Sequence, residues 1–145
     1  MELIVVIMIV GILGAIAMPR FFDNRSFQER GYYENLTAGL KFAQKLAVAS
    51  GCPVRVQVDA GGYEARQQQA LAGRCDPSDT SFSTLVVLAD GQALLAVAPS
   101  GVTASPNATI VFDALGRTDL VFDQTINVGS YALIVRADSG YIDAP

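Results

Sequence analysis

The segment Met1–Phe21, MELIVVIMIVGILGAIAMPRF, decides how this chain is organised. The sixteen residues from Leu3 to Met18 are all apolar or glycine, and a single carboxylate, Glu2, precedes them. This composition predicts a helix that is apolar on every side. At about 1.5 Å per residue the helix spans roughly 24 Å, slightly less than the ~30 Å hydrocarbon core of a bilayer.

Three interpretations of this apolar segment are open. A removable secretory signal would explain the small residues Ala15–Ala17 as a cleavage site, although such a signal begins with Lys or Arg. A buried core helix would need protein on all sides, and a chain of 145 residues supplies little. A membrane helix is the favoured interpretation. Glu2 then either lies solvated among lipid headgroups or has a paired, functional role, because a carboxylate in lipid is costly.

Three further residues shape the predicted helix. Gly11 and Gly14 would allow a second helix to approach closely. Pro19 lacks an amide donor and opposes the carbonyl one turn earlier, so we expect a kink or a loosened turn there. A short apolar rod with a charged tip and a weak joint suits a segment that leaves lipid and packs against copies of itself.

The composition of the remaining chain excludes several functions. Residues 31–145 carry seven basic and eleven acidic residues and therefore hold the whole net charge of −4. An acidic body argues against nucleic-acid binding, which needs a basic patch. Without histidine there is no Ser-His-Asp or Cys-His arrangement, and no GxxxxGK phosphate loop occurs. We expect no catalytic residues, no cofactor and no metal.

The segment CDPSDTS, residues 75–81, gathers the only candidate metal ligands. Asp76, Asp79 and the neighbouring hydroxyls offer oxygen atoms that calcium accepts. Their spacing does not match an EF-hand loop, and a solvated turn is the preferred interpretation.

The two cysteines, Cys52 and Cys75, lie twenty-three residues apart. In an exported protein they predict one disulfide, and in a cytosolic protein two reduced thiols. Two cysteines without histidine are too few for a structural zinc site. The N-terminal segment favours export, and a bridge would then tie the end of the following helix to the strands, contributing roughly 3 kcal/mol.

From Phe21 onward the pattern is that of an amphipathic helix. Apolar residues recur at three- and four-residue spacing, and Gly51 and Pro53 end the helix near Ser50. The apolar positions are Leu36, Leu40, Ala43 and Ala47. If this helix continues from residue 3 it is about 70 Å long. Pro19 and residues 23–26 are its expected weak points.

After Cys52 the period becomes two. Val54, Val56 and Val58 alternate with polar residues, and Gly61-Gly62 predicts a hairpin turn. Later apolar runs, separated by turn residues, predict further short antiparallel strands. The fold class is therefore α+β, with a long N-terminal helix packed on an antiparallel sheet. Residues 1–20 form the membrane or fibre-core half of the helix, and residues 21–145 form the globular domain.

The segment Met1–Phe22 resembles the N-terminal helix of type IV pilins and type II secretion pseudopilins. In that family a prepilin peptidase removes a leader ending in Gly, and a Phe-Thr-Leu-like stretch leads into a glutamate. The resemblance implies that Met1 falls inside the mature helix and that Glu2 is this glutamate. Its partner in the family is the N-terminal amine of a neighbouring subunit. An ion pair allows both charges to be buried together, whereas either alone is strongly penalised.

The resemblance extends to the FimT/GspH subgroup of minor pilins and pseudopilins. It rests on LKFAQKLAVASGCPVRVQV (residues 40–58), ATIVFDALGR (108–117) and YALIVRADSGYID (131–143). The cysteine pair and GILGAIAMPRFFD (11–23) resemble in particular the minor pilins of the mannose-sensitive haemagglutinin pilus.

This resemblance implies a structural subunit of the bacterial inner membrane with a periplasmic C-terminal domain, which then enters a fibre. Its implied partners are other pilins, an inner-membrane assembly platform, the prepilin peptidase and membrane lipid. A pseudopilin of a type II secretion system, and a membrane-anchored binding domain that never polymerises, are the alternatives. A relative is associated with DNA uptake, but residues 131–145 hold one Arg and two Asp, so we expect no DNA affinity. The long polar loops 71–81 and 99–108 are plausible contact surfaces.

Overall fold

The computed structural model describes the backbone of residues 2–21 and 24–145, and the side-chain surroundings of residues 2–12 and 25–145. It contains two helices, α1 (Glu2–Phe21) and α2 (Asn24–Ser50). The predicted helix end near Ser50 is confirmed, and Gly51 follows it with a φ of +68°, the left-handed conformation that favours glycine at a helix C-terminus. The expected weak point at residues 23–26 lies partly outside the described residues, because Phe22 and Asp23 are not described.

The first sheet follows directly after α2. The predicted hairpin at Gly61-Gly62 is present, with Asp59 paired to Gly62. The strands run antiparallel in the order β5-β2-β1-β8, and β6 also pairs with β2. Their bounds are β1 (Val54–Asp59), β2 (Gly62–Gln67), β5 (Thr84–Leu85), β6 (Leu95–Val97) and β8 (Ala108–Phe112).

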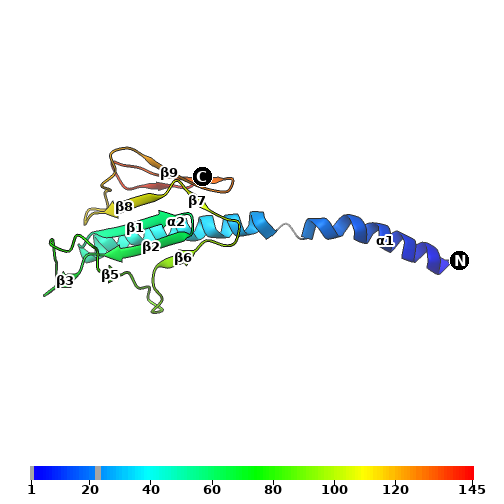
Figure 1. Ribbon diagram of the computed structural model, residues 1–145, viewed down its shortest axis with the longest axis horizontal. Helices are drawn as coiled ribbons and strands as arrows, with labels where there is room; N and C mark the ends of the chain where they lie inside the picture. The colour runs from blue at the N-terminus through cyan, green and yellow to red at the C-terminus, as the bar shows by residue number, and fades with distance from the viewer. Residues whose placement is uncertain (1, 22–23) are drawn as a thin grey trace.

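The remaining strands form separate sheets, which corrects the expectation of one antiparallel sheet. The second sheet has the order β11-β10-β9-β7, and β3 pairs only with β4. β7 lies just before β8 in the chain but pairs with β9, so the chain enters the second sheet, returns to the first at β8, and reaches β9 through the long connection 113–123 (Figure 1). These strands are β3 (Ala70–Leu71), β4 (Arg74–Cys75), β7 (Ala104–Ser105), β9 (Gln124–Val128), β10 (Tyr131–Val135) and β11 (Ile142–Asp143).

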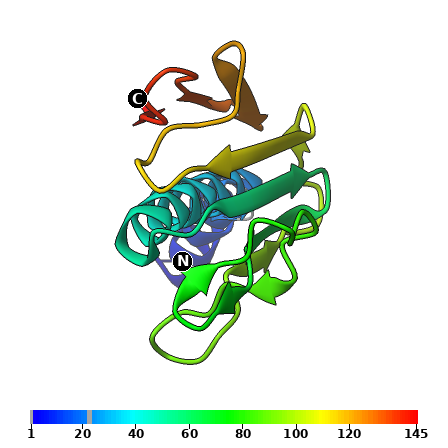
Figure 2. The same ribbon diagram turned by 90° about the vertical axis from the view of Figure 1, so that its left-hand side faces the viewer.

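Helix α2 joins the two larger sheets. It contacts β1, β2, β6 and β8 of the first sheet and β9, β10 and β11 of the second. Figure 2, seen nearly along α2, shows strands of both sheets curving round the helix. The predicted apolar face is confirmed, because Leu36, Leu40, Ala43 and Ala47 are fully buried. Full burial of each leucine stabilises the fold by about 1.5–3 kcal/mol. The α+β fold class is therefore confirmed.

Two tyrosines near the start of α2 belong to this core. Tyr32 and Tyr33 are buried, and the ring centroids of Tyr33 and Tyr131 lie 5.3 Å apart. The Tyr33 hydroxyl donates to the carbonyl oxygen of Ala132 at 3.3 Å. Burial raises the pKa of Tyr32 to about 12. Both tyrosine rings therefore belong to the core of the domain.

Candidate functional site

The first candidate region is α1, where no other described part of the chain covers the large apolar side chains from Leu3 to Ile12. All the large apolar side chains from Leu3 to Ile12 are exposed. Glu2 lies in the first turn, where the positive end of the helix dipole favours a carboxylate. In Figure 1, α1 extends away from the strands, so its apolar surface is available to other molecules.

The other N-terminal residues singled out by sequence also lie on α1. A Cβ atom built on Gly11 would meet no other atom within 4 Å, so its helix surface is open to a close approach. Gly14 and Pro19 lie within the bounds of α1, but their surroundings fall outside the described residues, and the kink at Pro19 stays a prediction. In the described part of the chain, no helix meets the length and hydropathy required of a membrane span.

The second candidate feature is the disulfide at the far end of α2. Cys52 and Cys75 are bonded, with their Cα atoms 5.4 Å apart, so the predicted pairing is confirmed. Cys75 lies on β4, in the small hairpin with β3, and not in either larger sheet. The bridge therefore fastens this hairpin to the junction between α2 and β1.

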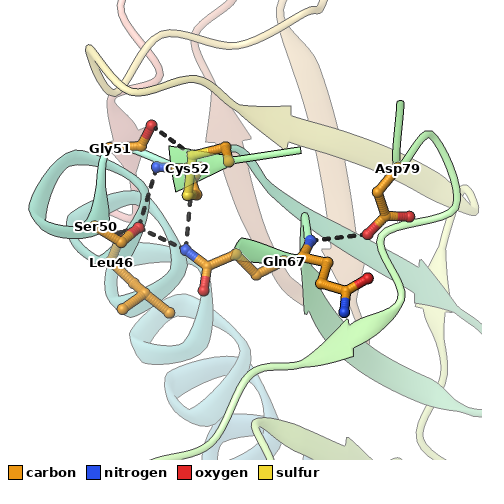
Figure 3. Close-up of a disulfide and its surroundings, with 8 residues drawn as sticks. Leu46, Ser50, Gly51, Cys52, Gln67 and Asp79 are labelled. Atoms are coloured by element: carbon orange, nitrogen blue, oxygen red, sulfur yellow. Dashed lines mark hydrogen bonds between the residues drawn. A yellow bond between two sulfur atoms is a disulfide. The ribbon is translucent and has the colours of Figure 1, made fainter. Parts of the chain in front are cut away.

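Polar contacts centred on Ser50 reinforce that junction (Figure 3). The Ser50 hydroxyl donates to the carbonyl oxygen of Leu46 at 2.7 Å. Its oxygen accepts hydrogen bonds from the Cys52 amide at 3.2 Å and from Nε2 of Gln67 at 2.5 Å. The end of α2, the start of β1 and the end of β2 are thus connected through one hydroxyl.

The carboxylates of the segment 75–81 accept hydrogen bonds from nearby backbone amides and serine hydroxyls. Oδ2 of Asp79 accepts from the amides of Gln69 and Ser83 at 2.8 and 2.9 Å, and Oδ1 accepts from the Ser81 hydroxyl at 2.7 Å. These hydrogen bonds, the one from the Ser83 amide first, hold the pKa of Asp79 well below its usual range. Asp76 accepts from the amide and hydroxyl of Ser78. Among the described residues no group of three or more His, Cys, Asp or Glu side chains is placed to hold a metal.

Sequence reasoning missed the contact between Arg55 and this loop. Nη2 of Arg55 donates to the carbonyl oxygen of Ser81 at 2.6 Å, and its guanidinium carbon lies 4.8 Å from the centroid of the Phe82 ring. Phe82 is buried and has a φ of +56°, which is uncommon for a residue with a side chain. Arg55 is one of the polar residues that alternate with the predicted strand valines, but no local pattern names its partner.

Sequence reasoning also missed Gln44, because only the apolar residues of this helix were singled out. Nε2 of Gln44 donates to the carbonyl oxygens of Gly116 and Gly140 at 2.8 and 3.0 Å. Gly116 belongs to the turn after β8 and has a φ of +79°, and Gly140 belongs to the turn after β10 and has a φ of +68°. A single side chain therefore fastens two turns to the helix. The available signal was its position directly after Ala43, on the edge of the apolar stripe.

Comparisons with known proteins find a matching family model and solved structures with a similar fold. A family model described as type II transport protein GspH matches residues 33–140. The fold is similar to that of the type IV minor pilin FimU of Pseudomonas aeruginosa in two crystal forms. The match to the first crystal form has a TM-score of 0.58 and 16% sequence identity, and it covers 84% of this chain and 91% of the FimU chain. The match to the second crystal form has a TM-score of 0.54 and 17% sequence identity, and it covers 80% of this chain and 91% of the FimU chain.

No match was found among curated protein sequences. The family model covers most of the chain and includes α2 from Tyr33, both larger sheets and the turns that Gln44 contacts. The resemblance to minor pilins and pseudopilins noted from the sequence is therefore confirmed, and the chain belongs to the GspH family of pilin-like proteins.

Proposed function

We propose that this chain is a minor pilin, a structural subunit that is held in the bacterial inner membrane by residues 1–20 and then assembled into a type IV pilus. Residues 21–145 form its periplasmic and later extracellular globular domain. The GspH family consists of structural pilin and pseudopilin subunits, and the proposed role is accordingly assembly rather than catalysis.

The observation that supports the proposal is the exposed apolar surface of α1 from Leu3 to Ile12, in a chain that also has a folded domain. The large side chains from Leu3 to Ile12 are exposed and meet no partner surface in the part of the chain that the structure describes. Such a continuous apolar surface on a protein marks a membrane or protein contact. Lipid covers it before assembly, and neighbouring helices of the same kind cover it in the fibre.

Glu2 supplies specificity to this exchange. Its carboxylate stands at the outer end of the apolar run, where an unpaired charge resists burial. By resemblance to the family, the N-terminal amine of an adjacent subunit neutralises it when helices stand side by side. The open surface at Gly11, and Gly14 three residues further on, suit close helix packing. The platform and peptidase of the inner membrane are the other partners that we propose.

The test is the substitution Glu2→Ala in the full chain expressed with its assembly system. We expect the variant to remain in the membrane fraction and to disappear from sheared fibres, because the carboxylate is needed only for pairing. Asp90→Ala, which removes a carboxylate exposed in the connection between β5 and β6, is the matched control and should enter fibres normally. Normal incorporation of the Glu2→Ala variant would contradict the mechanism.

A minor pseudopilin of a type II secretion system is the second candidate, favoured by the description of the matching family as a type II transport protein. Deletion of the gene separates the two functions. Loss of surface pili with intact secretion supports the pilin, and loss of secretion with intact pili supports the pseudopilin. The resemblance of residues 11–23 and of the cysteine pair to haemagglutinin-pilus subunits supports the first.

Two further functions have distinct readouts. A membrane-anchored binding domain that never polymerises would be absent from fibres with and without Glu2. A DNA-binding pilin would retard DNA in a salt-sensitive manner, which we do not expect from a chain with a net charge of −4.

A further inference from the structure

Three of the four asparagines in this chain are followed, two positions later, by serine or threonine, with no proline between them. The triplets are Asn24-Arg25-Ser26, Asn35-Leu36-Thr37 and Asn107-Ala108-Thr109. Serine and threonine together make up 16 of the 145 residues, so chance alone would give about one asparagine in nine such a neighbour. Asn-x-Ser/Thr is the acceptor motif of N-linked glycosylation, which modifies surface loops of exported proteins.

The fold separates the three motifs. Residues 24–26 lie in the first turn of α2, and residues 35–37 lie further along the same helix. A glycosyl transferase has to reach both the asparagine amide and the hydroxyl two positions later. A helical backbone would have to open locally before its residues could enter an enzyme cleft, which costs its hydrogen bonds. Both helical motifs are therefore poor acceptors in the folded chain.

Internal contacts also occupy the motif at Asn35. Oδ1 of Asn35 accepts a hydrogen bond from the Tyr63 hydroxyl at 2.6 Å. Leu36 is fully buried, and Thr37 is only 9% exposed. The hydroxyl that a transferase would need is thus covered by the globular domain.

The motif at Asn107 has the opposite surroundings. Asn107 lies in the turn between β7 and β8, outside both strands, and its side chain is exposed. Thr109, two positions later, is exposed on β8, which is the edge strand of the first sheet. The amide and the hydroxyl of this motif are both accessible without unfolding of a helix.

A shallow polar groove adjoins this turn. It has a volume of about 240 Å³ and is lined by Gln57, Val58, Asp59, Asn107, Ala108 and Thr109. Gln57 pairs with Thr109 across β1 and β8, so these two side chains share the outer face of the sheet. Amide, carboxylate and hydroxyl groups can all form hydrogen bonds with sugar hydroxyls. The first sugar of a glycan on Asn107 would therefore find polar partners beside the turn.

The turn also lies at the end of the domain nearest α1. β1 begins directly after the far end of α2 and runs back along it, and β8 runs antiparallel to β1, so β8 begins at the end that faces α1 (Figure 1). A sugar donor held in the membrane by a lipid chain would meet this end of the domain first.

We propose that Asn107 is an N-glycosylation site, and that the donor is an oligosaccharide linked through pyrophosphate to a polyprenyl lipid. In the transfer, Nδ2 of Asn107 forms a bond to the anomeric carbon of the first sugar. The bond between that carbon and the pyrophosphate oxygen breaks, and the lipid pyrophosphate leaves with the electron pair. Nδ2 loses one proton to a base of the transferase, and nothing is oxidised or reduced. The inference rests on the proposed export of the globular domain, but it requires neither Glu2 nor entry into a fibre.

Mass spectrometry of the full chain, purified from membranes of the cells that naturally produce it, tests this site. After reduction, trypsin releases the peptides Gly31–Lys41 and Cys75–Arg117, in which Asn35 and Asn107 respectively are the only asparagines. We expect an added saccharide mass on most copies of Cys75–Arg117 and none on Gly31–Lys41. The intact mass should equal that of the chain plus one glycan, which leaves Asn24 unmodified.

Substitutions separate the motif from general effects on the fold. Asn107→Gln and Thr109→Ala should each lower the glycosylated fraction at least tenfold. Thr109→Ser keeps the hydroxyl and should retain at least a third of the modification. Asn127→Gln is the matched control, because Asn127 is the one asparagine outside any such motif, and it should leave the glycosylated fraction unchanged.

Several results would overturn the site. They are an unmodified Cys75–Arg117 peptide, a saccharide on that peptide that persists in Asn107→Gln, and a glycan on Asn24 or Asn35 in place of Asn107. If the chain enters fibres without a glycan, this inference fails and the proposed function stands. If Asn107 carries the glycan but the chain enters no fibre, the site is supported and the proposed function fails.

Discussion

Gln44 provides the sharpest test of how the globular domain is held together. Gln44→Ala removes the amide that donates to Gly116 at 2.8 Å and to Gly140 at 3.0 Å. Each half-buried hydrogen bond contributes about 1 kcal/mol, and the orphaned carbonyl oxygens add to the loss, giving ~2–3 kcal/mol. The higher helix propensity of alanine returns less than ~0.5 kcal/mol. We therefore expect the free energy of unfolding to fall by about 2 kcal/mol.

The assay is urea unfolding of the full chain in mild detergent, followed by far-UV circular dichroism. Lys45→Ala is the control, because Lys45 is the exposed next residue of the same helix. Gln44→Glu keeps the size of the side chain but replaces its donor with oxygen, so at pH 7 it should lose at least as much stability as Gln44→Ala. If Gln44→Ala changes the free energy of unfolding by no more than Lys45→Ala does, our account of how the second sheet is attached is wrong.

Three further predictions concern the same end of the domain. Cys52→Ser with Cys75→Ser should lower the free energy of unfolding by about 3 kcal/mol, and the unmutated chain should show no free thiol when denatured without reductant. Gly140→Ala should destabilise by more than ~2 kcal/mol in the same urea assay, since a Cβ would overlap the carbonyl oxygen of Gly116 at a φ of +68°. Gly73→Ala, with a φ of +78° and open space, should lose only about 1 kcal/mol. The pKa of Asp79 is lower in the folded chain than in the unfolded one, so its contribution is complete above the ordinary aspartate pKa and is lost as the pH falls towards the folded value. Melting temperatures measured from pH 6 to pH 2 should accordingly fall less steeply for Asp79→Asn.

The sequence was sufficient for features that depend on neighbouring residues. The apolar run after Glu2, the buried stripe of α2 and its end at Ser50 follow from periodicity and capping over a few turns. The β1–β2 hairpin follows from alternating valines and a Gly-Gly turn. The disulfide could be predicted because the chain has only two cysteines, and the apolar N-terminus favours an oxidising compartment.

Only the tertiary structure decided which distant residues meet. Gln44 and Gly140 are 96 positions apart, and Arg136 pairs with Asp123, which lies thirteen positions earlier. Short strands can pair in several orders with the same alternation of side chains, so the division into two larger sheets depends on how each packs on α2. The burial of a residue can be predicted from the local spacing of apolar residues, because side chains on one face of a helix or strand recur with a fixed period. The partners in a polar contact depend instead on the path of the whole chain. The sequence thus determined an acid-tipped apolar helix on an α+β domain, and the tertiary structure determined how the strands divide between two larger sheets and which turns Gln44 fastens to α2.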